Sequence, residues 1–254
     1  MNILPAPPVS EDFQGINPLP TDPTYGWFFE TFHWNRLSLI ADPLGANNTV
    51  LSCTVQPGDV VNGGERCEFS YQPADPVSYE RHFDWEFMIP ANYNDPQPGE
   101  WQHMGQFHDQ PEDGDWSNYP SNSPPISCDY EYSVVSTLPQ AITAFWDLNF
   151  PGWTSMVVND RISTMSVSVG VTAPKEIIMA VPFTKGTWQK IGLDIRWSHD
   201  AEGGWVKAYH DDVLLGQHNG QNMHNDYFHY FKLGIYRSPV AFSNTVYYKN
   251  VNII

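Results

Sequence analysis

The sequence predicts an all-β fold in which two antiparallel sheets pack together. Short runs of β-branched and aromatic residues are separated by Gly, Pro, Asn and Asp, which is typical of strands joined by turns. No helical stripe longer than about ten residues interrupts these runs. The chain has 254 residues, of which 41% are hydrophobic and 15% aromatic. Such a chain can bury a full core, and all-β sandwiches of this size often form one domain.

The predicted strands follow an N-terminal segment, residues 1–25, that is rich in proline and indicates an extended arm. No linker divides the remaining chain, so residues 26–254 are predicted to form a single domain. The strands are expected at 49–55, 66–72, 79–89, 101–108, 164–172, 188–197, 204–210, 228–237 and 245–253.

Turns and loops complete the expected layout. Asp200–Gly204 joins two of the strands as a hairpin, and Asp211–Asp212 turns the chain back toward Val213. The acidic segment 109–127 contains Pro, Ser, Asn and Gly and is predicted to be a long loop, of the kind that often carries function. Residues 138–163 fit no element.

The charge balance limits the classes of partner. Twelve Lys and Arg face 29 Asp and Glu, giving a formal charge of −17, which repels nucleic acid and anionic membranes. A polyanionic substrate is still compatible, because cations in a groove act at short range and the wider field is screened over about 8–10 Å. No apolar run reaches the roughly 18 residues of a membrane span.

Three cysteines are present. Cys53 and Cys67 flank a turn, so a disulfide across a hairpin is one interpretation and free buried thiols are the default. Cys128 needs no partner.

The most informative stretch is residues 230–237. In a strand, Tyr230, Lys232, Gly234 and Tyr236 share one face, while the intervening apolar residues share the other. Two phenols and an ammonium on one face suit a groove that holds a polymer and moves protons. An ordinary half-buried strand would show the same pattern.

Two other stretches repeat this logic. Gln106 and His108 share one strand face, where an amide and an imidazole can bind a carboxylate and accept a proton. Arg66 and Glu68 also share a face, so Arg66 either binds a carboxylate of the substrate or pairs with Glu68.

Three motifs, in this order along the chain, resemble the β-jelly-roll polysaccharide lyases, the group that contains glucuronan lyases, heparin lyase I and, more distantly, alginate lyases. They are Gly64–Phe69 (GERCEF), Gly105–His108 (GQFH) and Tyr230–Arg237 (YFKLGIYR). The resemblance implies a β-jelly roll with a concave substrate groove. It also implies β-elimination of a uronic-acid polymer such as glucuronan, which leaves 4,5-unsaturated uronate ends.

The same resemblance implies roles for individual residues. Tyr236 is the acid that protonates the leaving O4 and also a base, and His108 is either the base or a carboxylate neutraliser. Gln106 and Arg66 polarise the substrate carboxylate, which makes the C5 proton more acidic. Substrate contacts are expected from Tyr230, Lys232, Arg237, Asn225 and His103.

Stereochemistry and ionisation refine these roles. In glucuronate and mannuronate, H5 and O4 lie on the same side of the ring, so one tyrosine serves both steps. In guluronate and iduronate they lie on opposite sides, and His108 has to take the proton. A tyrosine base must ionise from a reference pKa of about 10, and nearby cations favour the phenolate, so an alkaline optimum is expected.

Two other classes of function compete with the lyase. A strand at 79–87 places Asp84 and Glu86 on one face, as a glycoside hydrolase would need for its two carboxylates. A non-catalytic carbohydrate-binding module would use the aromatic residues only for stacking. For the lyase we expect an anionic polysaccharide substrate, a monomer and a secreted or periplasmic location. No cofactor is expected, and a structural calcium is the alternative.

Overall fold

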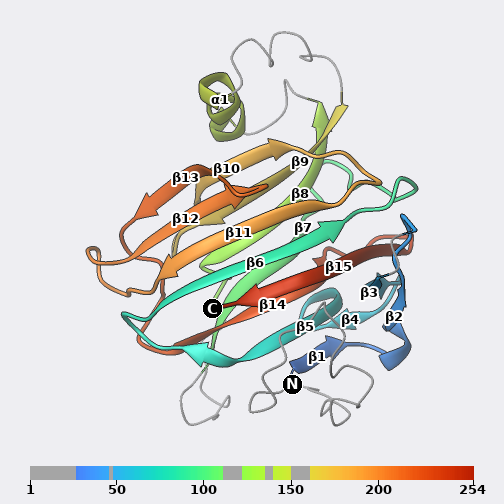
Figure 1. The fold of residues 1–254 in the computed structure, drawn as a ribbon, viewed down its shortest axis with the longest axis horizontal. Coiled ribbons are helices and arrows are strands. Elements are labelled where there is room, and N and C mark those ends of the chain that lie inside the picture. Colours follow the sequence, from blue (N-terminus) through green and yellow to red (C-terminus); the bar gives the residue numbers. More distant parts are fainter. Residues whose placement is uncertain (1–26, 46–47, 111–121, 135–139, 150–160) are drawn as a thin grey trace.

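The computed structural model describes residues 27–45, 48–110, 122–134, 140–149 and 161–254. They form two antiparallel sheets that pack face to face as a jelly-roll-like sandwich (Figure 1), which confirms the predicted all-β class. The predicted arm at 1–25 and the centre of the predicted loop 109–127 lie outside the described residues.

The eight-stranded sheet carries the 228–237 stretch near its middle. Its order in space is β1 (Trp27–Thr31), β5 (Gly64–Asp75), β14 (Phe228–Arg237), β7 (Gln102–Gln110), β8 (Ile126–Val134), β9 (Arg161–Val169) and β10 (Glu176–Pro182), with β4 (Val60–Val61) paired to β5.

The seven-stranded sheet forms the other layer. Its order is β13 (Val213–Asn219), β12 (Trp205–His210), β11 (Gln189–Arg196), β6 (Glu80–Met88), β15 (Asn244–Ile253), β3 (Thr49–Val55) and β2 (Leu37–Ala41). A short 3-10 helix, η2 (Trp34–Arg36), precedes β2.

The core lies between the sheets and is dominated by aromatic rings. Phe231 of β14 packs against Trp85 of β6 with ring centroids 5.1 Å apart, and Phe83 meets Phe107 at 4.9 Å. These four rings are buried. The alternation along β14 therefore sends Phe231, Leu233 and Ile235 into the core and Tyr230, Lys232 and Tyr236 to the outer face of the eight-stranded sheet.

Most predicted strands are confirmed. Those at 49–55 and 228–237 match β3 and β14, and the others agree to within a few residues at each end, apart from wider shifts at β5 and β9. The predicted strands did not include β1, β2, β4, β8, β10 and β13, although the expected turn at Asp211–Asp212 leads into β13.

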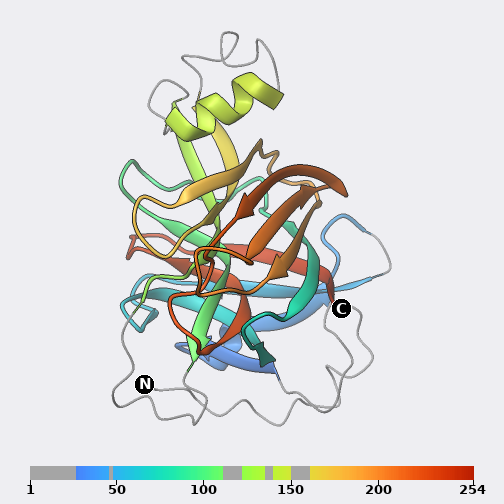
Figure 2. The same cartoon turned by 90° about the vertical axis from the view of Figure 1, so that its left-hand side faces the viewer.

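A helix, α1 (Gln140–Asn149), occupies part of the segment that fitted no element. It lies at one end of the sandwich (Figures 1 and 2) and contacts β10. The buried Trp146 anchors it, because its indole Nε1 donates to the carbonyl oxygen of Ala180 at 3.0 Å. No helix among the described residues is long and apolar enough to span a membrane.

The Asp211–Asp212 turn is confirmed as a two-residue hairpin loop. His210 pairs with Val213 across it, and Asp211 and Asp212 have φ of 48° and 65°. Aspartate tolerates this left-handed conformation better than most residues do.

The cysteines are all free thiols and all buried, as the default interpretation held. Cys53 lies on β3 and Cys67 on β5, and these strands belong to opposite sheets. The two thiols therefore do not face each other across a hairpin, and the disulfide interpretation is wrong. Burial raises the pKa of the Cys53 and Cys128 thiols well above the ordinary value.

One side of the sandwich is closed by contact between strands of different sheets. β10 at the edge of the eight-stranded sheet lies against β13 at the edge of the other. Gly216 makes this approach possible, because a Cβ atom there would lie 1.6 Å from the carbonyl oxygen of Ile178. Only a residue without a side chain fits between the two backbones.

Gly216→Ala should therefore destabilise the fold by about 3 kcal/mol, because the added methyl group pushes one backbone away from the other. Urea denaturation followed by tryptophan fluorescence measures this loss. A Cβ atom on Gly58 would meet no atom within 4 Å, and φ there is +86°. Gly58→Ala should cost only about 1 kcal/mol of backbone strain. Equal losses in the two variants would contradict the close approach of β10 and β13.

Candidate functional site

The candidate site lies on the outer face of the eight-stranded sheet, where β14 runs between β5 and β7. Across β14 and β5, Tyr236 pairs with Arg66. Across β14 and β7, Lys232 pairs with Gln106 and Tyr230 with His108. The three motifs singled out from the sequence therefore meet on adjacent strands.

A buried network of charged and amide groups holds the centre of this face. Arg66 Nη1 and Lys232 Nζ both donate to the carboxylate of Glu30 on β1, the latter at 2.5 Å. Arg66 Nε lies 3.3 Å from Glu68 Oε2, and Gln106 Nε2 donates to Glu68 Oε1 at 2.5 Å. All five residues are at most 8% exposed. Two cations and two carboxylates thus balance each other away from water.

The network keeps its members charged. Burial disfavours the Glu30 carboxylate, but the charges of Lys232 and Arg66 outweigh burial and lower the pKa of Glu30 to about 2. Burial likewise opposes the charged form of Lys232 and of Arg66. The neighbouring carboxylates, Glu30 first for Lys232 and Glu68 first for Arg66, outweigh it and raise both pKa values.

Tyr236 stands half-buried at one end of the network. The guanidinium carbon of Arg66 lies 3.7 Å from the centroid of its ring, a cation–π contact. Trp101 and His103 flank the same ring at centroid distances of 4.6 and 5.8 Å. The phenol hydroxyl donates to the carbonyl oxygen of Asn62 at 3.0 Å.

A β-bulge brings His103 to this face. Strict alternation would place His103 with Phe107 on the core side of β7. The β7–β8 register shifts between His103 and Gly105, and the β7–β14 register shifts between Leu233 and Tyr236. An extra residue in one strand reverses the alternation, and bulges of this kind often re-aim side chains beside active sites.

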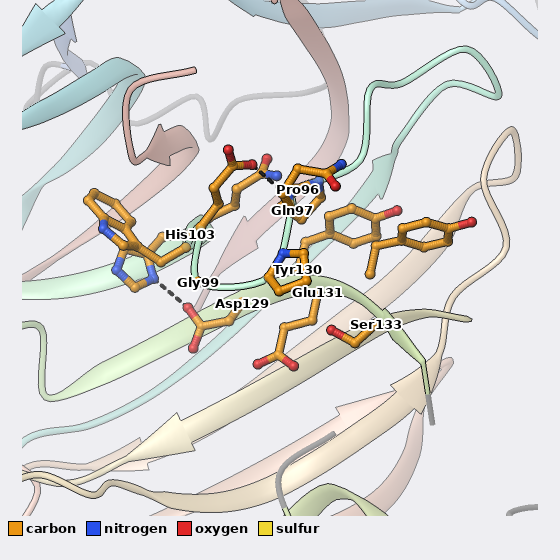
Figure 3. Close-up of a pocket in the computed structure, with 13 residues that line it drawn as sticks. Pro96, Gln97, Gly99, His103, Asp129, Tyr130, Glu131 and Ser133 are labelled. Atoms are coloured by element: carbon orange, nitrogen blue, oxygen red, sulfur yellow. Dashed lines mark hydrogen bonds and ion pairs between the residues drawn. The ribbon is translucent and has the colours of Figure 1, made fainter. Parts of the chain in front are cut away.

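His103 is oriented by a carboxylate from β8. Its Nδ1 contacts Asp129 Oδ1 in a short ion pair, drawn in Figure 3. The hydroxyls of Ser127 and Ser168 donate to the other oxygen of Asp129 at 3.0 and 3.2 Å. Burial opposes ionisation of Asp129, but the charge of His103 outweighs it and lowers the pKa. The chain thus holds the ring in a fixed orientation beside Tyr236.

A second histidine–tyrosine pair lies at the other end of the network. The rings of His108 and Tyr230 are 6.2 Å apart, and Lys232 Nζ lies 5.1 Å from the Tyr230 ring. Burial, followed by the charge of Lys232, lowers the pKa of His108. Burial also raises the pKa of Tyr230 to about 12, despite the opposing charge of Lys232. Near neutral pH, His108 is an uncharged base and Tyr230 a protonated phenol.

Gly234 lies between the two pairs on the same face of β14. It has a φ of +140°, and a Cβ atom there would lie 2.2 Å from the carbonyl oxygen of Cys67. Glycine is therefore required, and the outer face has no side chain at this position. Tyr236 and Tyr230 are six residues apart, or about 20 Å along the strand. His108 and Tyr236 therefore do not touch and lie too far apart to act on the same sugar ring, and the buried Gly234 lies between them.

The structure corrects one predicted contact residue. Arg237 is fully buried, its guanidinium forms an ion pair with Glu65 at 2.9 Å, and its Nη2 donates to the carbonyl oxygen of Phe242. Its period along β14 places it on the face opposite Tyr236, so it is wrong as a substrate-binding residue. Asn225 lies near the His108 end, where its amide donates to Asp109 at 2.8 Å.

The expectation for Arg66 is resolved in favour of pairing within the sheet. Arg66 and Gln106 both bind Glu68, and they are 5% and 1% exposed. Their side chains therefore bind a buried carboxylate beneath the outer face and do not extend into solvent. Sequence reasoning missed Glu30 and Asp129, since neither belongs to a motif and each meets its partner only through the fold.

The carboxylates of the competing hydrolase interpretation lie on the other sheet. Asp84 Oδ2 contacts His82 at 3.0 Å, and Asn252 donates to its other oxygen at 2.9 Å. Glu86 accepts from Asn250 at 2.5 Å and lies 3.7 Å from Lys249 Nζ. Both carboxylates already have polar partners on the seven-stranded sheet.

A pocket opens beside His103, between β8 and the segment that precedes β7 (Figure 3). Its volume is about 300 Å³, and residues 96–103 and 129–133 line it. Trp101 and His103 line the pocket and also contact Tyr236, so the pocket is continuous with the candidate site. Among the described residues, no group of three or more His, Cys, Asp or Glu could hold a metal ion.

The jelly-roll-like sandwich has a polar face that carries phenols, imidazoles and buried cations, and such a face suits a carbohydrate-active enzyme. A family model described as "Polysaccharide lyase" matches residues 21–252. The chain therefore belongs to the polysaccharide lyase family.

Solved structures show the same fold. An endo-β-1,4-glucuronan lyase from the fungus Trichoderma reesei is 14% identical, with a TM-score of 0.56 and 85% of each chain covered. The alginate lyase Aly36B is 10% identical, with a TM-score of 0.53, covering 89% of this chain and 85% of that one. At these identities the likeness shows the fold alone.

The fold is shared with a glycoside hydrolase as well. The family 131 catalytic domain from Coprinopsis cinerea is 14% identical, with a TM-score of 0.53, covering 91% of this chain and 82% of that one. No curated protein sequence matches this chain.

The buried network predicts an acid-dependent loss of stability. The pKa of Glu30 falls from an ordinary 4.5 to about 2 on folding. Its stabilising contribution is therefore complete above pH 4.5 and is lost as the pH falls from 4.5 toward 2. Glu30→Gln should lower the free energy of unfolding at pH 7, and the gap from the wild type should narrow below pH 4.5.

Urea titrations between pH 2.5 and 7 measure this gap. Glu80→Gln is a matched control, because Glu80 forms an exposed pair with Arg196 on the other sheet, and exposed pairs contribute little. A gap for Glu30→Gln that stays constant over this range would contradict the proposed charge balance.

Proposed function

We propose that this polysaccharide lyase cleaves a uronic-acid-containing polymer by β-elimination and leaves 4,5-unsaturated uronate ends. The observation that supports this most directly is the arrangement on β14. The phenol of Tyr236 stands half-buried on the outer face, with the Arg66 guanidinium 3.7 Å from its ring and the His103 ring 5.8 Å away. In a polymer laid along this face, the sugar over Tyr236 would meet that phenol at C5 and O4, and a neighbouring sugar would lie toward His108.

The chemistry needs two proton transfers and a way to hold charge. A base removes the C5 proton, the C–O4 bond breaks as the C4=C5 double bond forms, and an acid protonates O4. Tyr236 suits both tasks where H5 and O4 lie on the same side of the ring, because its hydroxyl stands at the half-buried end of the site, beside Arg66 and His103. His108 is kept neutral by burial and Lys232, but it lies too far along β14 to reach the same ring.

The buried cations support the step between these transfers. Negative charge develops on the substrate carboxylate as the C5 proton leaves, and fixed cations under the floor stabilise it without reorganising. Arg66 and Lys232 are held in place by Glu30. Both cations would act on the substrate through their electrostatic field from below the polymer. The sequence had led us to expect that they touch the substrate directly.

The family resemblance and the glucuronan and alginate lyase folds favour a polyuronate, of the glucuronan or alginate type, as substrate. A charged polysaccharide does not cross a membrane unaided, which favours a secreted or periplasmic enzyme. We also propose that the enzyme acts as a monomer, since the site is built entirely from one chain.

Tyr236→Phe should lower turnover by roughly 10³-fold, because one hydroxyl is removed without a change in packing. The unsaturated product absorbs near 235 nm, so initial rates on glucuronan and alginate measure the loss. The control is Tyr209→Phe, whose hydroxyl donates to Asp194 on the other sheet and which should keep full activity. Normal turnover by a folded Tyr236→Phe variant would rule out this role.

His108→Ala should raise KM more than it lowers kcat, because His108 lies about 20 Å along β14 from Tyr236 and would contact a different sugar unit from the one that is cleaved. Tyr236 then serves both proton transfers, so glucuronan and mannuronate-rich alginate, in which H5 and O4 lie on the same side of the ring, should be cleaved faster than guluronate-rich alginate. Initial rates at 235 nm over a range of polymer concentrations measure both constants, and His210→Ala on β12 is the control. A fall in kcat of roughly 10²-fold with an unchanged KM would show instead that His108 takes part in proton transfer.

A further inference from the structure

The pocket beside His103 has a different charge character from the floor over β14. Three carboxylates line it, those of Glu100, Asp129 and Glu131, and no Lys or Arg is among its lining residues. Asp129 and Glu131 extend from β8 on the same side (Figure 3). A uronate carboxylate placed here would meet like charge, and the imidazole of His103, which also lines the pocket, is already paired with Asp129.

Nearby cations do not reverse this character. Lys185 forms an ion pair with Asp95 at 2.8 Å and lies 5.6 Å from the Tyr132 ring. Arg161 also contacts that ring at 5.6 Å. Lys175, whose charge acts on Asp129, donates to the carbonyl oxygen of Pro124. None of the three lines the pocket.

The remaining walls suit an uncharged sugar. Trp101 is 38% exposed and offers an apolar surface on which the C–H face of a pyranose can stack. Glu131 is half-buried, and burial followed by the charge of Asp129 raises its pKa. Carboxyl oxygens accept hydrogen bonds from sugar hydroxyls. The volume of about 300 Å³ accommodates one monosaccharide unit.

We infer that the pocket formed by Trp101, Asp129 and Glu131 is a subsite for an uncharged sugar next to the uronate that is cleaved. The contacts of Trp101 and His103 with Tyr236 make the two positions adjacent. The preferred substrate is then a heteropolymer in which uronate alternates with an uncharged residue, rather than a pure polyuronate. This inference rests on the proposed function.

The test compares polymers by the rate of 235 nm product formation. Heparosan and hyaluronan alternate glucuronate with uncharged N-acetylglucosamine, whereas glucuronan and alginate are acidic at every unit. Heparin serves as the sulfated counterpart of heparosan. We expect kcat/KM to be at least about tenfold higher on one or both alternating polymers than on glucuronan and alginate, which corresponds to about 1.4 kcal/mol.

Two variants tie this preference to the pocket. Glu131→Gln removes the repulsion between Glu131 and a uronate carboxylate and keeps an oxygen that can accept a hydrogen bond. It should therefore raise kcat/KM on glucuronan and reduce the preference for alternating polymers over glucuronan. Trp101→Ala should raise KM on the alternating polymers more than it lowers kcat. Glu80→Gln on the opposite sheet is the control and should leave the preference unchanged.

The outcomes separate the inference from the proposed function. Glucuronan or alginate cleaved as well as the alternating polymers, with a ratio that Glu131→Gln leaves unchanged, would overturn the subsite and leave the lyase activity standing. No Tyr236-dependent product from any of these uronate polymers would overturn the proposed function itself.

Discussion

The site depends on one constraint, which is that charge buried under the outer face must be balanced where it lies. Removing an ion from water costs several kcal/mol, and only close partners of opposite sign offset that cost. Here β1 supplies Glu30, β5 supplies Arg66 and Glu68, and β14 supplies Lys232. A shift of register in any one of the three strands would separate a charge from its partner. The network thus fixes the strand alignment that also positions Tyr236 and His108.

Because side chains alternate along each strand, the same strands supply core residues on one face and site residues on the other. Two local irregularities depart from a regular sheet. The bulge in β7 turns His103 outward toward Asp129. Gly234 lets β14 approach the backbone of β5 closely. A regular sheet would provide the polar face, but neither this close approach nor the oriented imidazole. Both irregularities lie on strands that carry candidate site residues, and bulges are over-represented beside active sites.

The sequence was sufficient for features that depend on neighbouring residues. The period of two along 228–237 predicted both the strand and the faces of Tyr236 and Lys232. The Asp211–Asp212 hairpin followed from the backbone tolerance of aspartate. The short apolar runs of β2 and β10 were missed because such runs do not distinguish strand from other structure.

Long-range pairings were beyond the reach of local pattern. Lys232 meets Glu30 across 202 residues of chain, and no feature near either residue signals the other. The sequence could not predict which face of the sheet His103 occupies, because a bulge interrupts the period of two from which strand faces are assigned. Arg237 was misassigned because it belongs to a motif, although the alternation of β14 already placed it opposite Tyr236.

The contact of β10 with β13 at Gly216 has a consequence for behaviour at high concentration. Sheet edges expose unpaired backbone groups that can recruit strands from other molecules. Because β10 and β13 lie against one another, a strand from another molecule has little room to pair with either edge. Among the described strands, the other two sheet edges are β1 and β2, which lie on the opposite side. Edge-to-edge association between copies of the enzyme is therefore expected to begin at β1 and β2 rather than at β10 and β13.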